Sequence, residues 1–349
     1  MSTIQVKNSY KRVNKFLKEG GILLDNANDN KIVLSYKEHL ILLGNKENTI
    51  LLKLRCIYLI NQYLVSINKT FKTFTKEVII QFLDWLETNR NVSIQTRNQR
   101  LACIKSFYKY VQSNELDLFD TCVLILSIKN KKVPNKMISY FSEEEIKIMI
   151  NFLNNSKDLK KLTMICVLYQ TGARVSQFIN IKLSDLNLSE NASITLYGKG
   201  NKTRIVPISQ ELVQLINKYI KQDYINYGDD CLFYSNLNKK YGRQGINYII
   251  KDLVIKLKNL NPSYFKGNYH PHSFRHTKAT HLYNNGTPLL YIKDFLGHST
   301  ITSTEIYATP DLGRQRKEIL KNAENIDTKK RYSSLKKETL DNWLKNNMK

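Results

Sequence analysis

The chain has 349 residues, of which 42% are hydrophobic, and it contains only 6 prolines and 13 glycines. This composition excludes a disordered chain and favours two or three globular domains that each bury a core of their own. The formal net charge of +24 at pH 7 is the strongest single constraint, because so large a surplus opposes compaction unless a polyanionic partner neutralises it.

The basic residues are spread along the chain and are not gathered in one tail. Clusters lie at 7–18, 129–132, 199–204, 239–243 and 314–317. A distributed surplus favours a protein that wraps a nucleic acid duplex. Charge alone leaves a plainer alternative open, namely a basic surface that only keeps the protein in solution or attracts it to a membrane.

The cysteines and the apolar runs indicate the compartment. The five cysteines are odd in number and are never spaced C-x-x-C, which predicts buried free thiols in a reducing environment: Cys56, Cys103, Cys122, Cys166 and Cys231. The N-terminal segment lacks an apolar signal region, and no uncharged run reaches the roughly 18 residues of a membrane span. We therefore expect a soluble, cytoplasmic protein.

The first part of the chain reads as helical. Residues 1–30 form a short basic lead that we expect to fold as one helix ending at Gly20–Gly21. From residue 31 to residue 128, apolar residues recur at helical spacing, and this pattern predicts a small helical bundle.

Three helices of this bundle have recognisable starts. They are predicted at 48–67, 75–89 and 96–112. Thr49 and Thr75 are the expected N-caps of the first two. For the third, Thr96-x-x-Gln99 has the pattern of a capping box.

A change of composition marks the end of the bundle. The segment 127–145 contains four lysines and one proline and shows no apolar period, so we expect a linker at 129–138. Ser142-x-x-Glu145 is a capping box that starts a new domain, which we place at 139–312.

The second domain is predicted to be mostly helical with a small sheet. Alternating residues at 193–209 predict a hairpin that turns at 198–202, and a helix ends at Gly172. The expected helices are 142–154, 160–171, 209–225, 244–259, 272–285, 288–296 and 300–307. The tail, 313–349, has no assigned fold.

The sequence "HPHSFRHTKATHL" (270–282) contains four of the six histidines. His272 and His276 are four residues apart and share one face of a helix, which is the spacing of a zinc site. A zinc hydrolase requires H-E-x-x-H, whereas Arg275 stands here and repels a divalent cation. We therefore expect no metal and no cofactor, and an anion facing this cluster.

Four separated segments have to be considered together. They are "TGARVSQF" with Arg174, "LYGKGNKTRIVPI" with Lys199, "HPHSFRH" with His272 and Arg275, and "LGHSTITSTEIYA" with His298 and Tyr307. This set resembles the tyrosine recombinase (phage integrase) family over residues 31–312. The resemblance implies a helical core-binding DNA domain at 31–128 and a mostly helical catalytic domain of tyrosine recombinase type.

The resemblance also implies roles. Arg174 and Arg275 correspond to the phosphate-binding arginines, and Lys199 to the general acid. His272 and His298 correspond to the two site histidines. Tyr307 corresponds to the nucleophile.

Elementary chemistry is consistent with these roles. Guanidinium groups contact phosphate oxygens in pairs and stay charged at working pH. Tyrosine has a reference pKa of about 10, so it needs a strongly positive pocket to attack phosphorus. Taken alone each residue is a weak signal: Tyr307 is one of 21 tyrosines, His298 after Gly297 could cap a helix, and Lys202 competes with Lys199. We assign His276 and His281 to supporting hydrogen bonds.

Two departures from the family pattern are visible. The family usually has a carboxylate three residues after the first arginine, where Gln177 stands here. A glutamine accepts a hydrogen bond but brings no charge, so the support of Arg174 is open. The Asn-Pro that often ends the helical domain is absent from 116–126.

These observations predict a site-specific DNA recombinase or integrase, most like those of mobile elements, acting through a 3′-phosphotyrosyl intermediate. The resemblance implies a tetramer on two double-stranded DNA sites, with accessory DNA-bending or directionality proteins as further candidate partners. The segment 311–326 is a candidate inter-subunit helix. Two alternatives remain open: a non-catalytic architectural DNA-binding protein, and a type IB topoisomerase that relaxes DNA.

Overall fold

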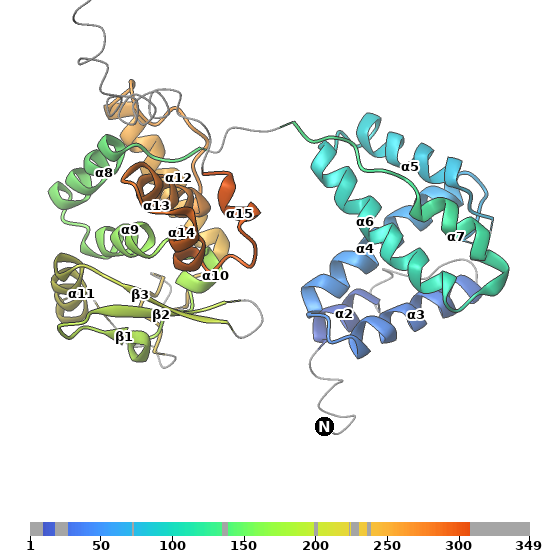
Figure 1. The fold of residues 1–349 in the computed structure, drawn as a ribbon, viewed down its shortest axis with the longest axis horizontal. Coiled ribbons are helices and arrows are strands. Elements are labelled where there is room, and N and C mark those ends of the chain that lie inside the picture. The colour runs from blue at the N-terminus through green and yellow to red at the C-terminus, as the bar shows by residue number, and fades with distance from the viewer. Residues whose placement is uncertain are drawn as a thin grey trace, which may run out of the picture. The chain divides into compact units, whose positions relative to one another are not determined.

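The computed structural model describes residues 10–17, 27–71, 73–134, 139–198, 202–222, 224, 230–235 and 239–307. The chain divides into two compact units, Met1–Lys136 and Met137–Lys349 (Figure 1). Both are built mainly from helices, and the second also contains a three-stranded sheet. The predicted fold class, mainly α with a small β-sheet, is confirmed.

The N-terminal unit is a helical bundle. Its helices are α2 (Lys11–Phe16), α3 (Ala27–Leu42), α4 (Glu47–Ser66), α5 (Lys76–Thr88), α6 (Ile94–Gln112) and α7 (Phe119–Leu126), with a short 3-10 turn at Leu116–Leu118 before α7. Aromatic side chains fill the core: Phe74 and Tyr108 stack with ring centroids 5.2 Å apart, and both are buried. Helix α2 is fixed to α4, because the backbone N–H of Arg12 donates to Glu47 Oε1 at 2.6 Å.

Two of the predicted helix starts in this unit are wrong. Helix α4 begins at Glu47 after Lys46, so Thr49 lies inside its first turn. Helix α6 begins at Ile94, because Ser93 accepts a hydrogen bond from the backbone N–H of Thr96 at 3.2 Å. A serine three residues upstream thus takes the capping position predicted for Thr96. Thr75 does occupy the N-cap position of α5.

The C-terminal unit places helices around a small sheet. Its elements are α8 (Glu143–Asn155), α9 (Leu159–Thr171), α10 (Val175–Phe178), a 3-10 turn (Leu183–Asp185), β1 (Leu186–Asn187), β2 (Ser193–Tyr197), β3 (Thr203–Pro207), α11 (Gln210–Gln222), α12 (Arg243–Leu260), α13 (Pro271–Asn284), α14 (Leu289–Leu296) and α15 (Thr302–Glu305). Helix α13 packs against α9 and α14. The predicted elements are present with ends shifted by a few residues.

The sheet is antiparallel in the order β1-β2-β3. Strands β2 and β3 form the predicted hairpin, with Ser193 opposite Pro207 and Tyr197 opposite Thr203. The first strand, β1, was not predicted because it has only two residues. One face of the hairpin is buried in the core through Ile194, Leu196 and Val206.

The predicted capping box at the start of α8 is confirmed. Glu145 N donates to Ser142 Oγ at 3.1 Å, and Ser142 N donates to Glu145 Oε2 at 2.8 Å. Glu145 is itself buried and accepts further bonds from Phe265 N at 2.5 Å and the Tyr269 hydroxyl at 3.0 Å. The start of α8 is thereby fixed to the segment that leads into α13.

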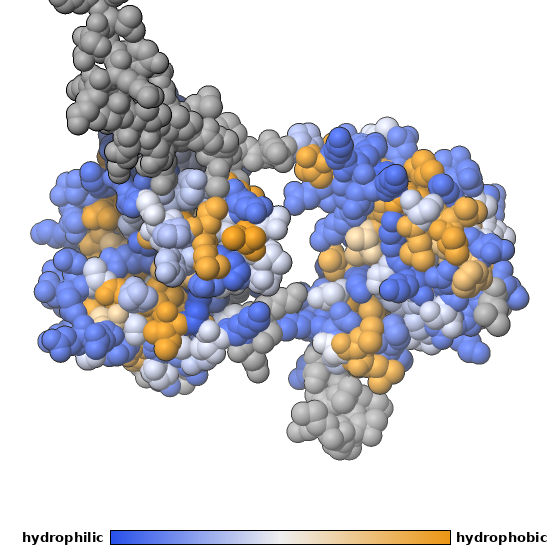
Figure 2. Space-filling model, in the orientation of Figure 1, coloured by the Kyte–Doolittle hydropathy of each residue, from blue (hydrophilic) through white to orange (hydrophobic). Residues whose placement is uncertain are grey.

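The described helices are too short or too polar to cross a membrane. The surface view is mostly hydrophilic, with small apolar patches on both units (Figure 2). Of the described cysteines, none is in a disulfide, and all but the half-buried Cys166 are buried. The predicted end of the lead helix at Gly20–Gly21 and the whole tail, 313–349, lie outside the described residues.

Candidate active site

Helix α13 carries the histidine-rich sequence. It begins at Pro271, a residue favoured in the first helical turn because it lacks an N–H that would stay unpaired. His270 precedes it, and its backbone N–H donates to Ser273 Oγ at 3.2 Å. His272, Arg275 and His276 follow within the first two turns. The helix therefore brings two imidazoles and one guanidinium to the same region.

Arg275 is fully buried, at 0% exposure. Its Nη1 donates to Gly172 O at 3.0 Å and its Nη2 donates to Leu296 O at 2.6 Å. Gly172 is the left-handed C-cap of α9, and Leu296 is the last residue of α14. The guanidinium thus lies between the carbonyl ends of two helices, where the helix dipoles favour a positive charge.

A second, partly buried guanidinium, that of Arg204, binds the same two helix ends. Its Nη1 donates to Phe295 O, and its Nη2 donates to Thr171 O at 3.2 Å and to Gly172 O at 3.4 Å. Sequence reasoning missed this residue. The signal was available, because Arg204 and Val206 are two residues apart on β3 and therefore point to the same, core-facing side of the strand.

The pKa values of Arg275 and of the partly buried Arg204 are both lowered. Burial, followed by the charge of Arg174, lowers the pKa of Arg275 to about 9 and the pKa of Arg204 to about 10. The Nε atoms of both are buried and have no hydrogen-bond partner among the described residues. Each guanidinium therefore keeps a donor that is not used within the described protein.

Arg174 is half-buried at the N-terminus of α10. Its backbone N–H donates to Gln177 Oε1 at 3.1 Å, and Gln177 Nε2 donates to Tyr197 O at 3.3 Å. Gln177 is buried. The glutamine therefore connects the arginine turn to the end of β2, and a carboxylate could not make the second of these bonds because it has no proton to donate.

The two site histidines lie in this positive environment. The His272 residue is exposed, whereas His298 is half-buried and its Nδ1 is 2.9 Å from Thr304 Oγ1. Burial first, and then the charge of Arg275, lower the pKa of each to about 4. Both imidazoles are neutral near pH 7.

Tyr307 is the last described residue and is 5% exposed. Its ring packs in a cluster with Ala279, Ile292 and Leu296. Its hydroxyl is 3.0 Å from His276 Nδ1. Burial raises the pKa of Tyr307, and the charges of Arg275 and Arg174 oppose that rise.

The structure thus brings five of the six predicted site residues into one region. They are Arg174, His272, Arg275, His298 and Tyr307, and the charges of the two arginines act on all three of the other groups. Lys199 lies outside the described residues. Of the described residues on either side of it, Gly198 N donates to Lys202 O at 2.7 Å.

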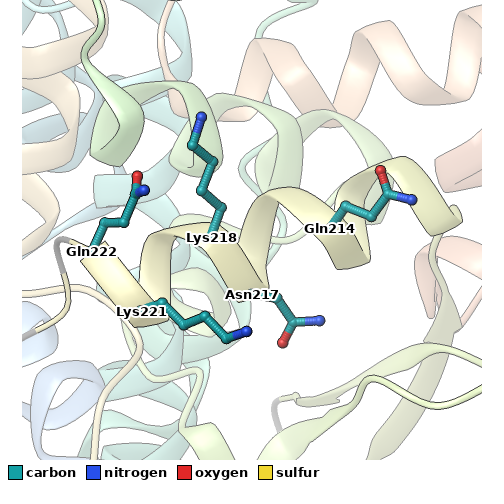
Figure 3. Close-up of a pocket in the computed structure, with 5 residues that line it drawn as sticks. All are labelled: Gln214, Asn217, Lys218, Lys221 and Gln222. Atoms are coloured by element: carbon teal, nitrogen blue, oxygen red, sulfur yellow. The ribbon is translucent and has the colours of Figure 1, made fainter.

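No group of three or more metal-ligating side chains occurs in the described part of the chain. A shallow hollow on α11 is lined by Gln214, Asn217, Lys218, Lys221 and Gln222, all from that one helix (Figure 3). It lies on the opposite side of the C-terminal unit from α15 (Figure 1). This hollow is therefore separate from the arginine and histidine cluster.

The model of the phage integrase family matches residues 139–313. The model of the phage integrase N-terminal SAM-like domain matches residues 56–118. Among curated proteins, tyrosine recombinase XerC of Staphylococcus aureus (strain JH9) is 28% identical over 251 residues, which is 71% of this chain and 80% of XerC.

Solved structures share the fold. XerH recombinase bound to palindromic difH in a post-cleavage complex has a TM-score of 0.66 at 17% identity, covering 88% of each chain. The Tn1549 transposon integrase in complex with a circular intermediate DNA has a TM-score of 0.62 at 18% identity, covering 83% of this chain and 99% of that one.

Proposed function

Because the chain belongs to the phage integrase family, and so is a tyrosine-type site-specific recombinase that breaks and rejoins DNA, we propose that Tyr307 is the nucleophile of the reaction. We also propose that the protein serves a mobile genetic element. The residues that carry the reaction, the DNA substrate and the assembly are inferred from the geometry of the C-terminal unit. The strongest single support is the burial of the Tyr307 phenol within reach of the charges of Arg174 and Arg275.

The proposed reaction is a transesterification. Tyr307 Oη attacks the scissile phosphorus, the P–O5′ bond breaks, and Lys199 donates a proton to the leaving O5′. The product is a 3′-phosphotyrosine that conserves the bond energy, so another 5′ hydroxyl reseals the strand without ATP. Donors aimed at charge that develops in the transition state contribute about 10²- to 10³-fold each.

Arg174 and Arg275 are proposed to hold the non-bridging oxygens. The support for Arg275 is electrostatic, because its charge acts on His272, His298 and Tyr307 while its Nη groups are fixed by Gly172 O and Leu296 O. A guanidinium with a fixed orientation needs no reorganisation when charge develops on the phosphate. His272 and His298 are proposed to donate or accept protons at the same phosphate, since both are neutral near pH 7.

Double-stranded DNA is the proposed substrate and a tetramer on two sites the proposed assembly. The net charge of +24 supports a duplex as partner, and among the solved structures with this fold one is a lambda integrase tetramer bound to a Holliday junction. The expected role of 311–326 as an inter-subunit helix is part of this proposal.

Two biological settings are compatible with this chemistry. The mobile-element setting is supported by "YIKDFLGHSTITSTEIYA" (residues 291–308), which resembles integrases of such elements. The alternative is chromosome-dimer resolution, which the identity to XerC favours. Sequencing the DNA that flanks the gene separates them, because inverted repeats at the boundaries of an element support the first setting and their absence supports the second.

A suicide substrate tests the chemistry. The DNA is nicked so that the cleaved end diffuses away, and a recombinase then accumulates a covalent adduct that is absent from Tyr307→Phe. An architectural protein forms no adduct with either chain. A type IB topoisomerase forms the adduct and relaxes supercoils but does not exchange strands between two sites.

The general acid has a separate test. Lys199→Ala is expected to lose cleavage of ordinary DNA and to regain it on a substrate with a 5′-bridging sulfur, which leaves without a proton. Lys202 follows three residues later in the sequence, and Lys202→Ala serves as the matched variant. Rescue of Lys202→Ala, and not of Lys199→Ala, would transfer the role to Lys202.

A further inference from the structure

The proposed nucleophile has a hydrogen-bond partner that the family resemblance does not assign to the reaction. Within the described residues, the Tyr307 hydroxyl is hydrogen-bonded to His276 Nδ1, 3.0 Å away. The ring centroids of the two side chains are 5.5 Å apart. His276 lies one residue after Arg275 on α13 and faces the tyrosine on the same side of the helix as His272, whose ring centroid is 4.6 Å away.

The chemistry of the pair fixes the direction of the hydrogen bond. A phenol is a stronger acid than a neutral imidazole N–H, and an imidazole nitrogen is a stronger base than a phenol oxygen. The favoured arrangement is therefore the tautomer with its proton on Nε2, in which Tyr307 Oη–H donates to His276 Nδ1. In this arrangement the phenolic proton already points at a base.

The surroundings keep His276 in the form that accepts a proton. Burial and several neighbours lower its pKa to about 3; these neighbours are His272, His270 and Arg275 around the start of α13 and His298 after α14. A phosphodiester that binds against the arginines adds a negative charge to this pocket. That charge raises the basicity of the imidazole at the stage at which the phenolic proton must leave.

We propose that His276 is a catalytic residue of strand cleavage that takes the phenolic proton of Tyr307 as the phenol attacks phosphorus. The inference rests on the proposed role of Tyr307 as nucleophile. In the step, the Oη–H bond breaks and an Nδ1–H bond forms, the Oη–P bond forms, and the P–O5′ bond breaks with protonation of O5′ by the general acid. On resealing, the imidazolium returns its proton to the phenol.

The first experiment compares two histidines of the same helix. His281 also places its Nδ1 3.0 Å from a phenol, that of Tyr169, which is not among the proposed site residues. Single-turnover cleavage of the suicide substrate is measured for wild type, His276→Asn and His281→Asn. Asparagine keeps an acceptor but cannot take a proton, so His276→Asn should slow cleavage by about 10²- to 10⁴-fold with unchanged DNA affinity, whereas His281→Asn cleaves normally.

The second experiment separates proton transfer from positioning. A fluorinated tyrosine with a lower phenol pKa is incorporated at position 307 in wild type and in His276→Asn. Without the base, the cleavage rate should depend on the acidity of the phenol. The fluorinated tyrosine should therefore raise the cleavage rate of His276→Asn at least about tenfold and change the rate of wild type little. If the Tm of His276→Asn is lowered, His276→Gln serves as the second variant.

Each other outcome overturns the inference. Normal cleavage by His276→Asn rules out a role for the imidazole, and slow cleavage without recovery by the fluorinated phenol reduces His276 to a positioning residue. If His281→Asn loses as much cleavage rate as His276→Asn, the loss comes from damage to the fold. A covalent adduct that still forms with Tyr307→Phe refutes the proposed function itself and is recognised independently of His276.

Discussion

Replacing Arg275 by alanine should damage the fold as well as the chemistry. The side chain is completely buried and its two Nη groups bind Gly172 O and Leu296 O. The substitution leaves Leu296 O without this donor and leaves Gly172 O with only the 3.4 Å bond from Arg204, and each lost bond to a buried carbonyl costs about 1–3 kcal/mol. Removing a desolvated charge offsets part of that loss, since burial is the main cause of the lowered pKa of Arg275. We therefore expect a net loss near the lower end, about 2–3 kcal/mol.

Differential scanning calorimetry on the full chain measures this effect. The C-terminal unit spans Met137–Lys349, and in a domain of that size each kcal/mol lowers Tm by about 2–4 °C. Arg275→Ala should therefore lower the transition of this unit by about 4–12 °C and leave that of the N-terminal unit in place. The Tm of Arg275→Lys should fall almost as far, because one ammonium group cannot bind both helix ends as a planar guanidinium does.

Arg174→Ala is the matched control. Arg174 is half-buried, and its recorded hydrogen bond uses the backbone, which alanine retains. This variant should lose cleavage but melt within about 1 °C of wild type, since the substitution leaves the backbone hydrogen bond to Gln177 in place. If Arg275→Ala melted like Arg174→Ala, the two helix ends would not depend on the guanidinium, and the structural role of Arg275 would be refuted.

Three further predictions address other parts of the unit. Ser142→Ala removes the capping box of α8 and should cost about 1 kcal/mol, measured as a lower urea midpoint, whereas Ser142→Thr should retain most of it. Gln177→Glu abolishes the donation to Tyr197 O and should slow cleavage without weakening DNA binding, and Gln177→Met should do the same; normal rates would show that the link is not needed. The pKa values of His272, His276 and His298 are lowered to about 4, 3 and 4. The free energy of unfolding should therefore fall as pH is lowered from about 6.5 towards 4, because the unfolded chain binds protons in this range that the folded chain does not bind, by at most about 1.4 kcal/mol per pH unit for each histidine. Urea titrations at pH 7 and pH 5 check the sign.

Local signals in the sequence predicted most of the helices and one helix start with its hydrogen bonds. Ser142 and Glu145 form the predicted capping box, because both of its partners lie within four residues and nothing nearby competes. At Thr96 the same pattern failed, because Ser93 offers an oxygen one turn earlier and the helix starts there. A capping pattern therefore identifies a helix start reliably only when no second cap residue stands just upstream.

The contacts that shape the site were beyond reach of any local pattern. Arg204 binds Phe295 O from 91 residues away, and His276 meets Tyr307 from 31 residues away. The sequence showed that Arg204 faces the core, but which carbonyls would receive it depends on how α9, α14 and the hairpin pack together. His276 was assigned a supporting role because its partner could not be identified without coordinates.

The hydrogen bonds of Arg275 and the partly buried Arg204 explain how a site with so much positive charge is stable before any anion binds. Arg204 and Arg275 share the carbonyl of Gly172, and each also binds the end of α14. The compensating negative charge is thus partial and comes from peptide dipoles, which cannot be protonated and do not compete for the remaining donors as a carboxylate would. A carboxylate at Gln177 would have neutralised part of the field of Arg174, whereas the amide leaves that field available. Burial is the main cause of the lowered pKa of Arg204 and Arg275, and the charge of Arg174 lowers both further. A phosphodiester bound beside these cations, as proposed, would offset that repulsion, so the electrostatics of the folded site favour an anionic ligand.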